Sequence, residues 1–420
     1  MYKELLSMRE DAEKIMSDSI TEVLPDIAVK KALEGMKFEG NLYVISFGKA
    51  GWQMAYAASQ ILKGKIKKGV IVTKYHHIKG DIPGFQMIEA GHPIPDQNSI
   101  YGAECVMNLI KETTEKDTIL MLISGGGSAL LEKPEKGLSL EEIQEVTKQL
   151  LDCGAGIQEI NTIRKRLSAV KGGKLAALAG GKAIYQIVLS DVIDNNLEMV
   201  ASGPACADSS TCADVMKIKK KYGLHFSERV EETLRKETVK SLSNVSTVIT
   251  GSVKELCRAV AKYAEKRGYK PYILTISMNG EAREAGRFLA SIARDIHKEK
   301  NMGFVKPCAL IAGGETVVTL TGNGMGGRNQ ELAFSGAAGI ADLSDTLLFS
   351  FGSDGTDGPT DAAGGIVDGD TMNQLRECNL DYEEILKRND TYHALKKIGG
   401  LLFTGATGTN VNDVAVVLIR

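Results

Sequence analysis

Short apolar runs rich in valine and isoleucine alternate along the chain with longer segments whose apolar residues recur at helical spacing. In the first half, the apolar runs cover residues 42–47, 69–73, 118–124 and 183–190. Uniformly apolar runs of this length are typical of strands buried on both faces of a parallel sheet. The segments 51–62, 98–112 and 140–151 carry their charges on one face, which predicts amphipathic helices. This alternation predicts a doubly wound α/β domain.

Polar residues dominate from 208 to 242, where we expect one or two surface helices. The alternation then resumes, with predicted strands at 247–250, 271–276, 308–313 and 347–352 and closing strands at 401–404 and 413–419. Predicted helices cover 253–266, 281–297 and 329–340, and the alternating, β-branched run 316–321 predicts an additional strand. We therefore predict two Rossmann-like α/β domains, residues 1–240 and 241–420.

Composition narrows the class of protein further. The chain has 420 residues with 51 basic and 53 acidic side chains, and this net charge of −2 argues against a nucleic-acid-binding protein. Hydrophobic residues make up 43% and charged residues 25%, which excludes a disordered chain. The seven cysteines include no CxxC pair, so we expect free thiols in a reducing compartment. No apolar run approaches the roughly 20 residues of a membrane span, and we expect a cytoplasmic protein.

Glycine is unusually frequent, with 45 residues, and gathers where predicted strands end. The richest segments are 46–51, 124–129, 313–316, 322–328, 352–358 and 405–410. In open α/β sheets ligands bind at the carboxyl ends of the strands, where glycine lets backbone N–H groups approach an anion. One such loop can be a simple tight turn, but their number predicts a phosphate-type ligand in a cleft between the two domains. No Walker A sequence occurs, and no GxGxxG fingerprint follows the first predicted strand, where the spacing of Gly48 and Gly51 is wrong for one.

Two of these glycine-rich loops each contain one cationic side chain. Lys49 follows a strand-ending glycine near the start of a helix, where an ammonium group is unfavourable without a partner anion. Arg328 follows Gly326 and Gly327 at another helix start, where a guanidinium can bridge two phosphoryl oxygens. The alternatives are an exposed lysine and an arginine in a capping or interdomain ion pair.

Carboxylates occupy comparable positions after the strands, namely Asp191, Glu315, Asp354 and Asp357. One or two carboxylates beside phosphate oxygens are enough for a Mg²⁺ site, although aspartates that cap loops are just as common. The histidines His76, His77 and His92 have no metal-ligand set at usable spacing, and only His92 is a candidate to line the cleft. No GxSxG serine occurs, so the inventory favours phosphoryl transfer, which needs positioning and charge neutralisation more than a nucleophile.

Taken in order, these motifs closely resemble the glycerate 2-kinase family, whose C-terminal part is called the MOFRL domain. The matching motifs are SFGKAG (46–51), AGHPIPD (90–96), SGGGSALL (124–131), INTIRKRLSAVKGGKLA (160–176), LSDV (189–192) with ASGP (201–204), GGETVV (313–318), GNGMGGRNQELA (322–333), GSDGTDGPTDAAGG (352–365) and TGATGTNVND (404–413). They span nearly the whole chain, which makes the resemblance specific.

The resemblance implies transfer of the γ-phosphoryl group of ATP, with Mg²⁺, to the 2-hydroxyl of D-glycerate in a site between the two domains. The products are 2-phosphoglycerate and ADP. Lys49 and Arg328 are then the catalytic cations, and Asp191 is our candidate to accept the hydroxyl proton. The expected nucleotide-binding residues are Gly48, Gly125, Gly126, Gly127, Ser128, Gly326, Gly327, Asn329 and Gly355, and the expected metal ligands are Glu315 and Asp354. In a predicted basic helix over 161–174, Arg164 and Lys171 are candidate contacts for glycerate or phosphate, the alternative being a plain basic flank.

Two other functions stay open at this point. An NAD(P)H-dependent hydroxypyruvate reductase is disfavoured because no GxGxxG follows the first predicted strand. A non-catalytic sugar-phosphate-binding protein would bind the same ligands and leave ATP intact. The sequence leaves the oligomeric state undecided, a homodimer being one option.

Overall fold

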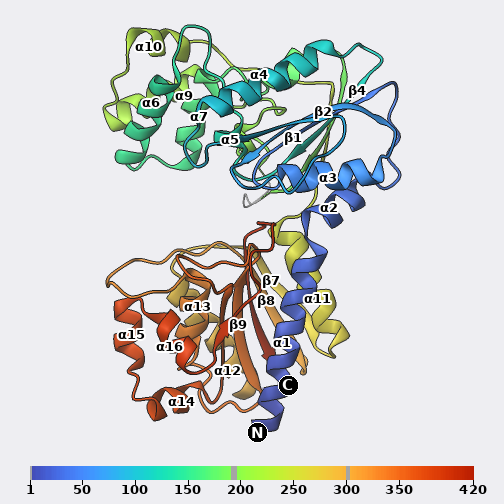
Figure 1. Cartoon of the computed structure of the whole chain (residues 1–420). Coiled ribbons are helices and arrows are strands. Elements are labelled where there is room, and N and C mark those ends of the chain that lie inside the picture. Colours follow the sequence, from blue (N-terminus) through green and yellow to red (C-terminus); the bar gives the residue numbers. More distant parts are fainter. Residues whose placement is uncertain (1, 191–195, 299–302) are drawn as a thin grey trace. The chain divides into compact units, whose positions relative to one another are not determined.

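In the computed structural model, which describes residues 2–190, 196–298 and 303–420, residues 25–250 form one unit around a six-stranded sheet (Figure 1). Every pair of neighbouring strands in this sheet is parallel. The elements are α2 (Pro25–Leu33), β1 (Leu42–Phe47), α3 (Gly51–Ile61), β2 (Ile66–Lys74), β3 (Phe85–Ala90), α4 (Gln97–Glu112), β4 (Thr118–Ile123), α5 (Gly127–Leu130), α6 (Leu140–Asp152), α7 (Ile157–Leu167), α8 (Lys174–Leu178), β5 (Ala183–Val188), the 3₁₀ turn η2 (Val200–Ser202), α9 (Cys212–Tyr222), α10 (Glu228–Leu234) and β6 (Val245–Ile249).

The strand order β3-β2-β1-β4-β5-β6 is that of a Rossmann sheet. After β1 the chain moves outward through β2 and β3, and it then returns to place β4 on the other side of β1. The connections that leave β1 and β4 therefore diverge, and in sheets of this order ligands bind at the carboxyl ends of these two strands. Both strands are fully buried, as their uniformly apolar sequences predicted.

Residues 1–24 and 251–420 form the second unit. Its elements are α1 (Tyr2–Glu22), α11 (Val253–Lys266), β7 (Lys270–Met278), α12 (Ala282–Lys298), β8 (Cys308–Gly314), α13 (Arg328–Gly336), β9 (Thr346–Gly352), β10 (Gly364–Asp368), α14 (Thr371–Glu377), α15 (Tyr382–Arg388), α16 (Thr391–Lys397), β11 (Leu401–Leu402) and β12 (Asp413–Ile419). The α/β class is confirmed, but the strand directions in this sheet are mixed. In the order β11-β10-β9-β12-β8-β7, only β7 and β8 are parallel.

The last strand, β12, lies between β8 and β9 and runs antiparallel to both, with Val416 opposite Ile311 and Phe349. All three strands are fully buried, so the C-terminal segment completes the centre of the sheet. The predicted strand at 316–321 is wrong. Val317 makes a single bridge to Glu281, and Val317 and Leu320 are 59% and 77% exposed. With the apolar side chains in solvent, β propensity alone does not hold a strand.

The first helix, α1, lies beside α11 and belongs to the second unit (Figure 1). Asp11 accepts from Arg420 and Tyr269, and Glu22 pairs with Lys262. The chain thus crosses between units at 24/25 and again at 250/251, whereas the predicted boundary was 240/241 with residues 1–24 in the first domain. Amphipathic periodicity predicts that a helix is packed but not which sheet it covers. No helix within the described residues is long and apolar enough to cross a membrane.

Candidate active site

The glycine loop after β4 carries four consecutive backbone N–H groups that have no acceptor among the described residues. On either side of the loop, Ser124 N donates to Phe47 O and Ala129 N donates to Gly126 O. Between them, the N–H groups of residues 125–128 have no hydrogen-bond partner in the described part of the chain. Gly126 is left-handed, with φ of +82°, which curls the loop. Successive free N–H groups on such a curl form an anion-binding nest.

The loop after β1 has the opposite character, because its N–H groups are used inside the protein. Gly48 N donates to Val72 O, Lys49 N to Gly125 O at 2.9 Å, and Ala50 N to Ser124 Oγ at 3.1 Å. A Cβ on Gly48 would lie 2.2 Å from Ser124 Oγ. Gly48 therefore permits close packing of the two loops, and the group this loop offers to a ligand is the Lys49 ammonium.

Lys49 lies beside the nest. A Cβ built on Gly126 would stand 3.1 Å from Lys49 Cγ and 3.0 Å from His92 Nε2. Within the described residues, no carboxylate lies within 4.0 Å of the Lys49 ammonium. Burial lowers the pKa of His92 to about 4, with Lys49, Lys74 and His77 adding to the effect. His92 is therefore a neutral hydrogen-bonding group at pH 7.

A chain of hydroxyl and amide groups supports the end of the nest. Ser128 Oγ and Ser202 Oγ are 2.8 Å apart, and Ser202 Oγ donates to Asn161 Oδ1 at 2.9 Å. Ala201 and Ser202 have φ of 50° and 60°, although neither is glycine. A left-handed conformation costs a residue with a Cβ roughly 1–2 kcal/mol. Such strain persists where the surrounding structure enforces it, and it gathers at functional sites.

Helix α7 ends at Leu167, so the predicted helix over 161–174 is wrong beyond that point. Gly172 and Gly173 both have positive φ and break the helix before Lys174. Lys171 is fully buried in an ion pair with Glu132 at 2.6 Å, and burial lowers its pKa to about 8. Arg164 instead donates from Nη2 to Ser128 O at 3.1 Å. Of the two candidate anion contacts, Arg164 is the one that reaches the nest.

In the second unit, Arg328 opens α13 and pairs with two carboxylates. Its Nε and Nη2 donate to Asp413 at 2.6 and 3.2 Å, and its Nη1 donates to Glu315 at 2.7 Å. Burial alone would lower the pKa of Arg328, but Asp413 and Glu315 outweigh it and raise the pKa. Burial raises the pKa of Asp413 to about 6 despite the arginine. The guanidinium keeps N–H groups beyond these three donors.

Asp357 holds the first turn of α13. Its carboxylate accepts from the backbone N–H of Asn329 and of Gln330 at 3.0 and 2.8 Å. The Asn329 side chain donates to Asp357 and accepts from Ser350 Oγ at 2.6 Å, so this predicted nucleotide contact is satisfied inside the protein. The N–H groups of residues 326–328 have no acceptor within the described ranges. Gly326 and Gly327 thus leave backbone donors without an acceptor next to Arg328, although Gly327 itself is buried.

The two predicted metal ligands, Glu315 and Asp354, differ in how far their carboxylate oxygens are already used by other groups of the protein. Glu315 is committed to Arg328, whereas Asp354 Oδ1 accepts only from Thr356 N at 3.1 Å among the described residues. Asp354 and Asp413 flank Gly352, because a Cβ there would lie 3.3 Å from an oxygen of each. No group of three or more histidine, cysteine or acidic side chains in the described part of the chain could hold a metal ion. Asp191, the predicted proton acceptor, lies outside the described residues.

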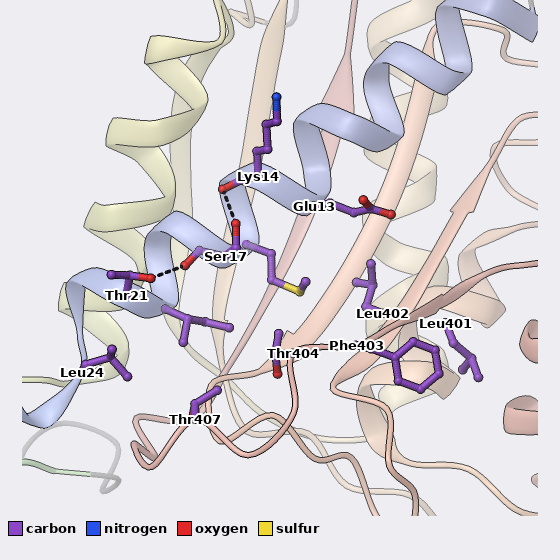
Figure 2. A pocket seen from close by; sticks show the side chains of 12 residues that line it. Glu13, Lys14, Ser17, Thr21, Leu24, Leu401, Leu402, Phe403, Thr404 and Thr407 are labelled. Carbon is purple, nitrogen blue, oxygen red and sulfur yellow. Dashed lines mark hydrogen bonds between the residues drawn. The ribbon is translucent and has the colours of Figure 1, made fainter. Parts of the chain in front are cut away.

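The glycine at 355 serves packing, since a Cβ on it would lie 1.9 Å from Gly405 O. The neighbouring Thr407 donates to Ser353 O and lines a hollow of about 700 Å³ between α1 and residues 401–407 (Figure 2). The hydroxyl hydrogens of Ser17 and Thr21 in this hollow are donated to carbonyl groups of α1 itself. The charged residues that line the hollow are Glu13 and Lys14, both from α1.

Within the described residues, a Rossmann-type sheet with a nest of free N–H groups and a lysine without an ion-pair partner at the ends of β1 and β4 defines the class of α/β proteins whose strand ends suit oxyanion ligands. Residues 11–235 match a domain of unknown function, DUF4147, and residues 308–413 match the MOFRL family. The D-glycerate 2-kinase of Thermotoga maritima is 49% identical over 413 residues, covering 98% of this chain and 99% of that protein. The glycerate 2-kinase of Pyrococcus horikoshii is 44% identical over 438 residues, covering 99% and 98%.

The crystal structure of the glycerate kinase from Thermotoga maritima matches with a TM-score of 0.95 and covers 99% of this chain and 100% of that chain. The chain therefore belongs to the glycerate 2-kinase family, which confirms the resemblance of its motifs.

Proposed function

We propose that this protein transfers the γ-phosphoryl group of ATP to the 2-hydroxyl of D-glycerate. The observation that carries the proposal is the nest at residues 125–128 with the Lys49 ammonium beside it. Four N–H donors and a cation match the charge that spreads over phosphoryl oxygens during transfer, and they need no reorganisation when the reaction begins. The names of the two relatives supply the substrate.

In the proposed reaction, a bond forms between the 2-hydroxyl oxygen of glycerate and the γ-phosphorus, and the bond from that phosphorus to the bridging oxygen of ADP breaks. The hydroxyl proton passes to a carboxylate, for which Asp191 is our candidate. Lys49 and the nest neutralise phosphoryl charge, and Arg328 is proposed to contribute to the same reaction through its remaining N–H groups.

We further propose that Mg²⁺ accompanies the nucleotide and that Asp354 is its protein ligand. Carboxylate oxygens suit this ion, and one or two of them suffice when phosphate oxygens supply the rest. Asp354 fits this role better than Glu315, because Glu315 would have to leave Arg328. The ion would supply further neutralisation of phosphate charge.

The cytoplasm is the proposed location, because all seven cysteines are free thiols. A homodimer is the proposed assembly, and light scattering that reports the mass of a single chain would overturn it.

The proposal is tested by measuring ADP formation from ATP and D-glycerate with a coupled assay. Phosphorus–proton coupling in the NMR spectrum of the product identifies the phosphorylated carbon. We expect ADP only when D-glycerate is present and phosphate on C2. Oxidation of NADH by hydroxypyruvate without coupling enzymes would favour the reductase instead, and tight binding of phosphorylated ligands with ATP left intact would favour a sensor.

A further inference from the structure

Five basic residues lie between 161 and 174, and four of them pair with carboxylates. The pairs are Lys165 with Asp208 at 3.1 Å, Arg166 with Glu237 at 3.2 Å, Lys171 with Glu132 at 2.6 Å and Lys174 with Glu135 at 2.6 Å. Arg164 is the exception, because no carboxylate lies within 4.0 Å of it among the described residues.

Arg164 is also half-buried. Among the described residues, its buried Nε has no acceptor, and the one side-chain hydrogen bond of Arg164 runs from Nη2 to Ser128 O. Burial lowers the pKa of Arg164, and the charge of Glu132 opposes that change without contact. Glu132 is itself committed to Lys171. A cation that is partly withdrawn from water without a counter-ion is unfavourable, and the cost falls when an anion binds it.

The hydrogen bond to Ser128 places Arg164 at the last residue of the nest. Lys49 lies near Gly126, so cations border two parts of the same four-residue loop. Each ligand anion needs its own counter-charge. Lys49 is a compact point charge suited to a phosphoryl group, whereas the planar fork of a guanidinium matches a carboxylate.

We propose that Arg164 binds the carboxylate of the α-hydroxy acid and thereby sets the position of its 2-hydroxyl. This inference rests on the proposed function, since it assigns the acceptor substrate to one side of the nest and the phosphoryl donor to the other. The competing source of the same oxyanion chemistry is a phosphate of the nucleotide. The two sources differ in which Michaelis constant responds when Arg164 is changed.

The test compares Arg164→Met with the wild-type protein and with Lys174→Met, which removes a paired charge from the same segment. We expect Arg164→Met to raise KM for D-glycerate about 10- to 150-fold, the range for losing a hydrogen bond to a charged group, with KM for ATP unchanged. Lys174→Met should leave both constants within about twofold. Free guanidinium ion should restore part of the D-glycerate affinity of Arg164→Met, which a merely structural role would not permit.

Two outcomes overturn the inference while the wild-type kinase is active. In one, KM for ATP rises and KM for D-glycerate does not, which assigns Arg164 to the nucleotide. In the other, both constants are unchanged and only the melting temperature falls. If the wild-type protein forms no ADP with D-glycerate, calorimetric titration with D-glycerate tests the carboxylate site independently of the kinase reaction. Binding that Arg164→Met weakens supports the carboxylate site without the kinase reaction, and no binding by the wild-type protein overturns both.

Discussion

The nest after β4 can be tested by a single methyl group. In Gly126→Ala, the new Cβ would lie 3.0 Å from the His92 ring and 3.1 Å from Lys49 Cγ, so both side chains must shift by a few tenths of an ångström. The backbone would also hold alanine at φ of +82°, which costs roughly 1–2 kcal/mol. The loop can escape this strain only by uncurling, and uncurling turns its N–H groups away from a common anion.

The matched control is Gly180→Ala. Gly180 has φ of +64°, and nothing lies within 4 Å of the point where its new methyl group would stand, so it carries the same backbone strain far from any contact with the nest. Both variants should lose roughly 1–2 kcal/mol of unfolding free energy, or about 2–8 °C of melting temperature for a unit of this size. Only Gly126→Ala should lose turnover, by about 100- to 1,000-fold if the loss resembles removal of a preorganised transition-state donor.

The assays are urea unfolding and ADP release with D-glycerate, measured on both variants. Turnover of Gly126→Ala within about twofold of Gly180→Ala would refute the reasoning, because the curl of the loop would then have no part in holding phosphoryl oxygens. Equal losses in both variants would point to general destabilisation and refute it as well.

Three further predictions concern charge. Lys49→Met should lower kcat about 100- to 1,000-fold with little effect on unfolding, because the ammonium has no ion-pair partner among the described residues; wild-type turnover would contradict this. NMR titration should find the His92 pKa near 4, rising in Lys49→Met. That pKa lies below the value of 6.5 in the unfolded chain, so lowering the pH favours the unfolded state, in which His92 binds a proton more readily. The contribution of His92 to the free energy of unfolding is therefore fully present above pH 6.5 and decreases toward pH 4. His92→Gln should remove this pH dependence. Lys171→Met should cost about 3–5 kcal/mol in urea unfolding by leaving Glu132 buried and unpaired, and Lys171→Met with Glu132→Gln should recover much of it.

Much of the first sheet could be predicted because its strands are buried on both faces. The apolar runs at 42–47 and 118–124 match β1 and β4 to within one residue, and helices α3, α4 and α6 match within one residue at either end. Strand β3 was not predicted, since the sequence Phe85–Ala90 mixes polar and apolar residues at a half-exposed sheet edge. Strand β10 was missed for a different reason, because its two glycines obscure the apolar signal.

The candidate site was predictable where chemistry is local. Lys49 lies just beyond the end of β1, and the glycines at 125–127 follow β4 closely, so adjacency in sequence places them at the carboxyl ends of neighbouring strands. Adjacency could not show that the N–H groups of the first loop have acceptors inside the protein, while those of the second loop have none among the described residues. That difference depends on hydrogen bonds between residues far apart in the chain, such as Ala50 and Ser124, which are 74 positions apart.

By itself, then, the sequence determined the α/β class, the parallel first sheet, the glycine loops, the two cations and the family. These follow from periodicity and from residues that are neighbours in the chain. Tertiary structure alone decided that β12 lies between β8 and β9, that α1 packs with residues 251–420, and that Arg328 meets Asp413 across 85 residues of sequence. It also decided which basic residue of the segment 161–174 has no carboxylate partner among the described residues. The pairing of charges and of strands depends on which distant segments the core brings together, and the local hydrophobic pattern does not contain that information.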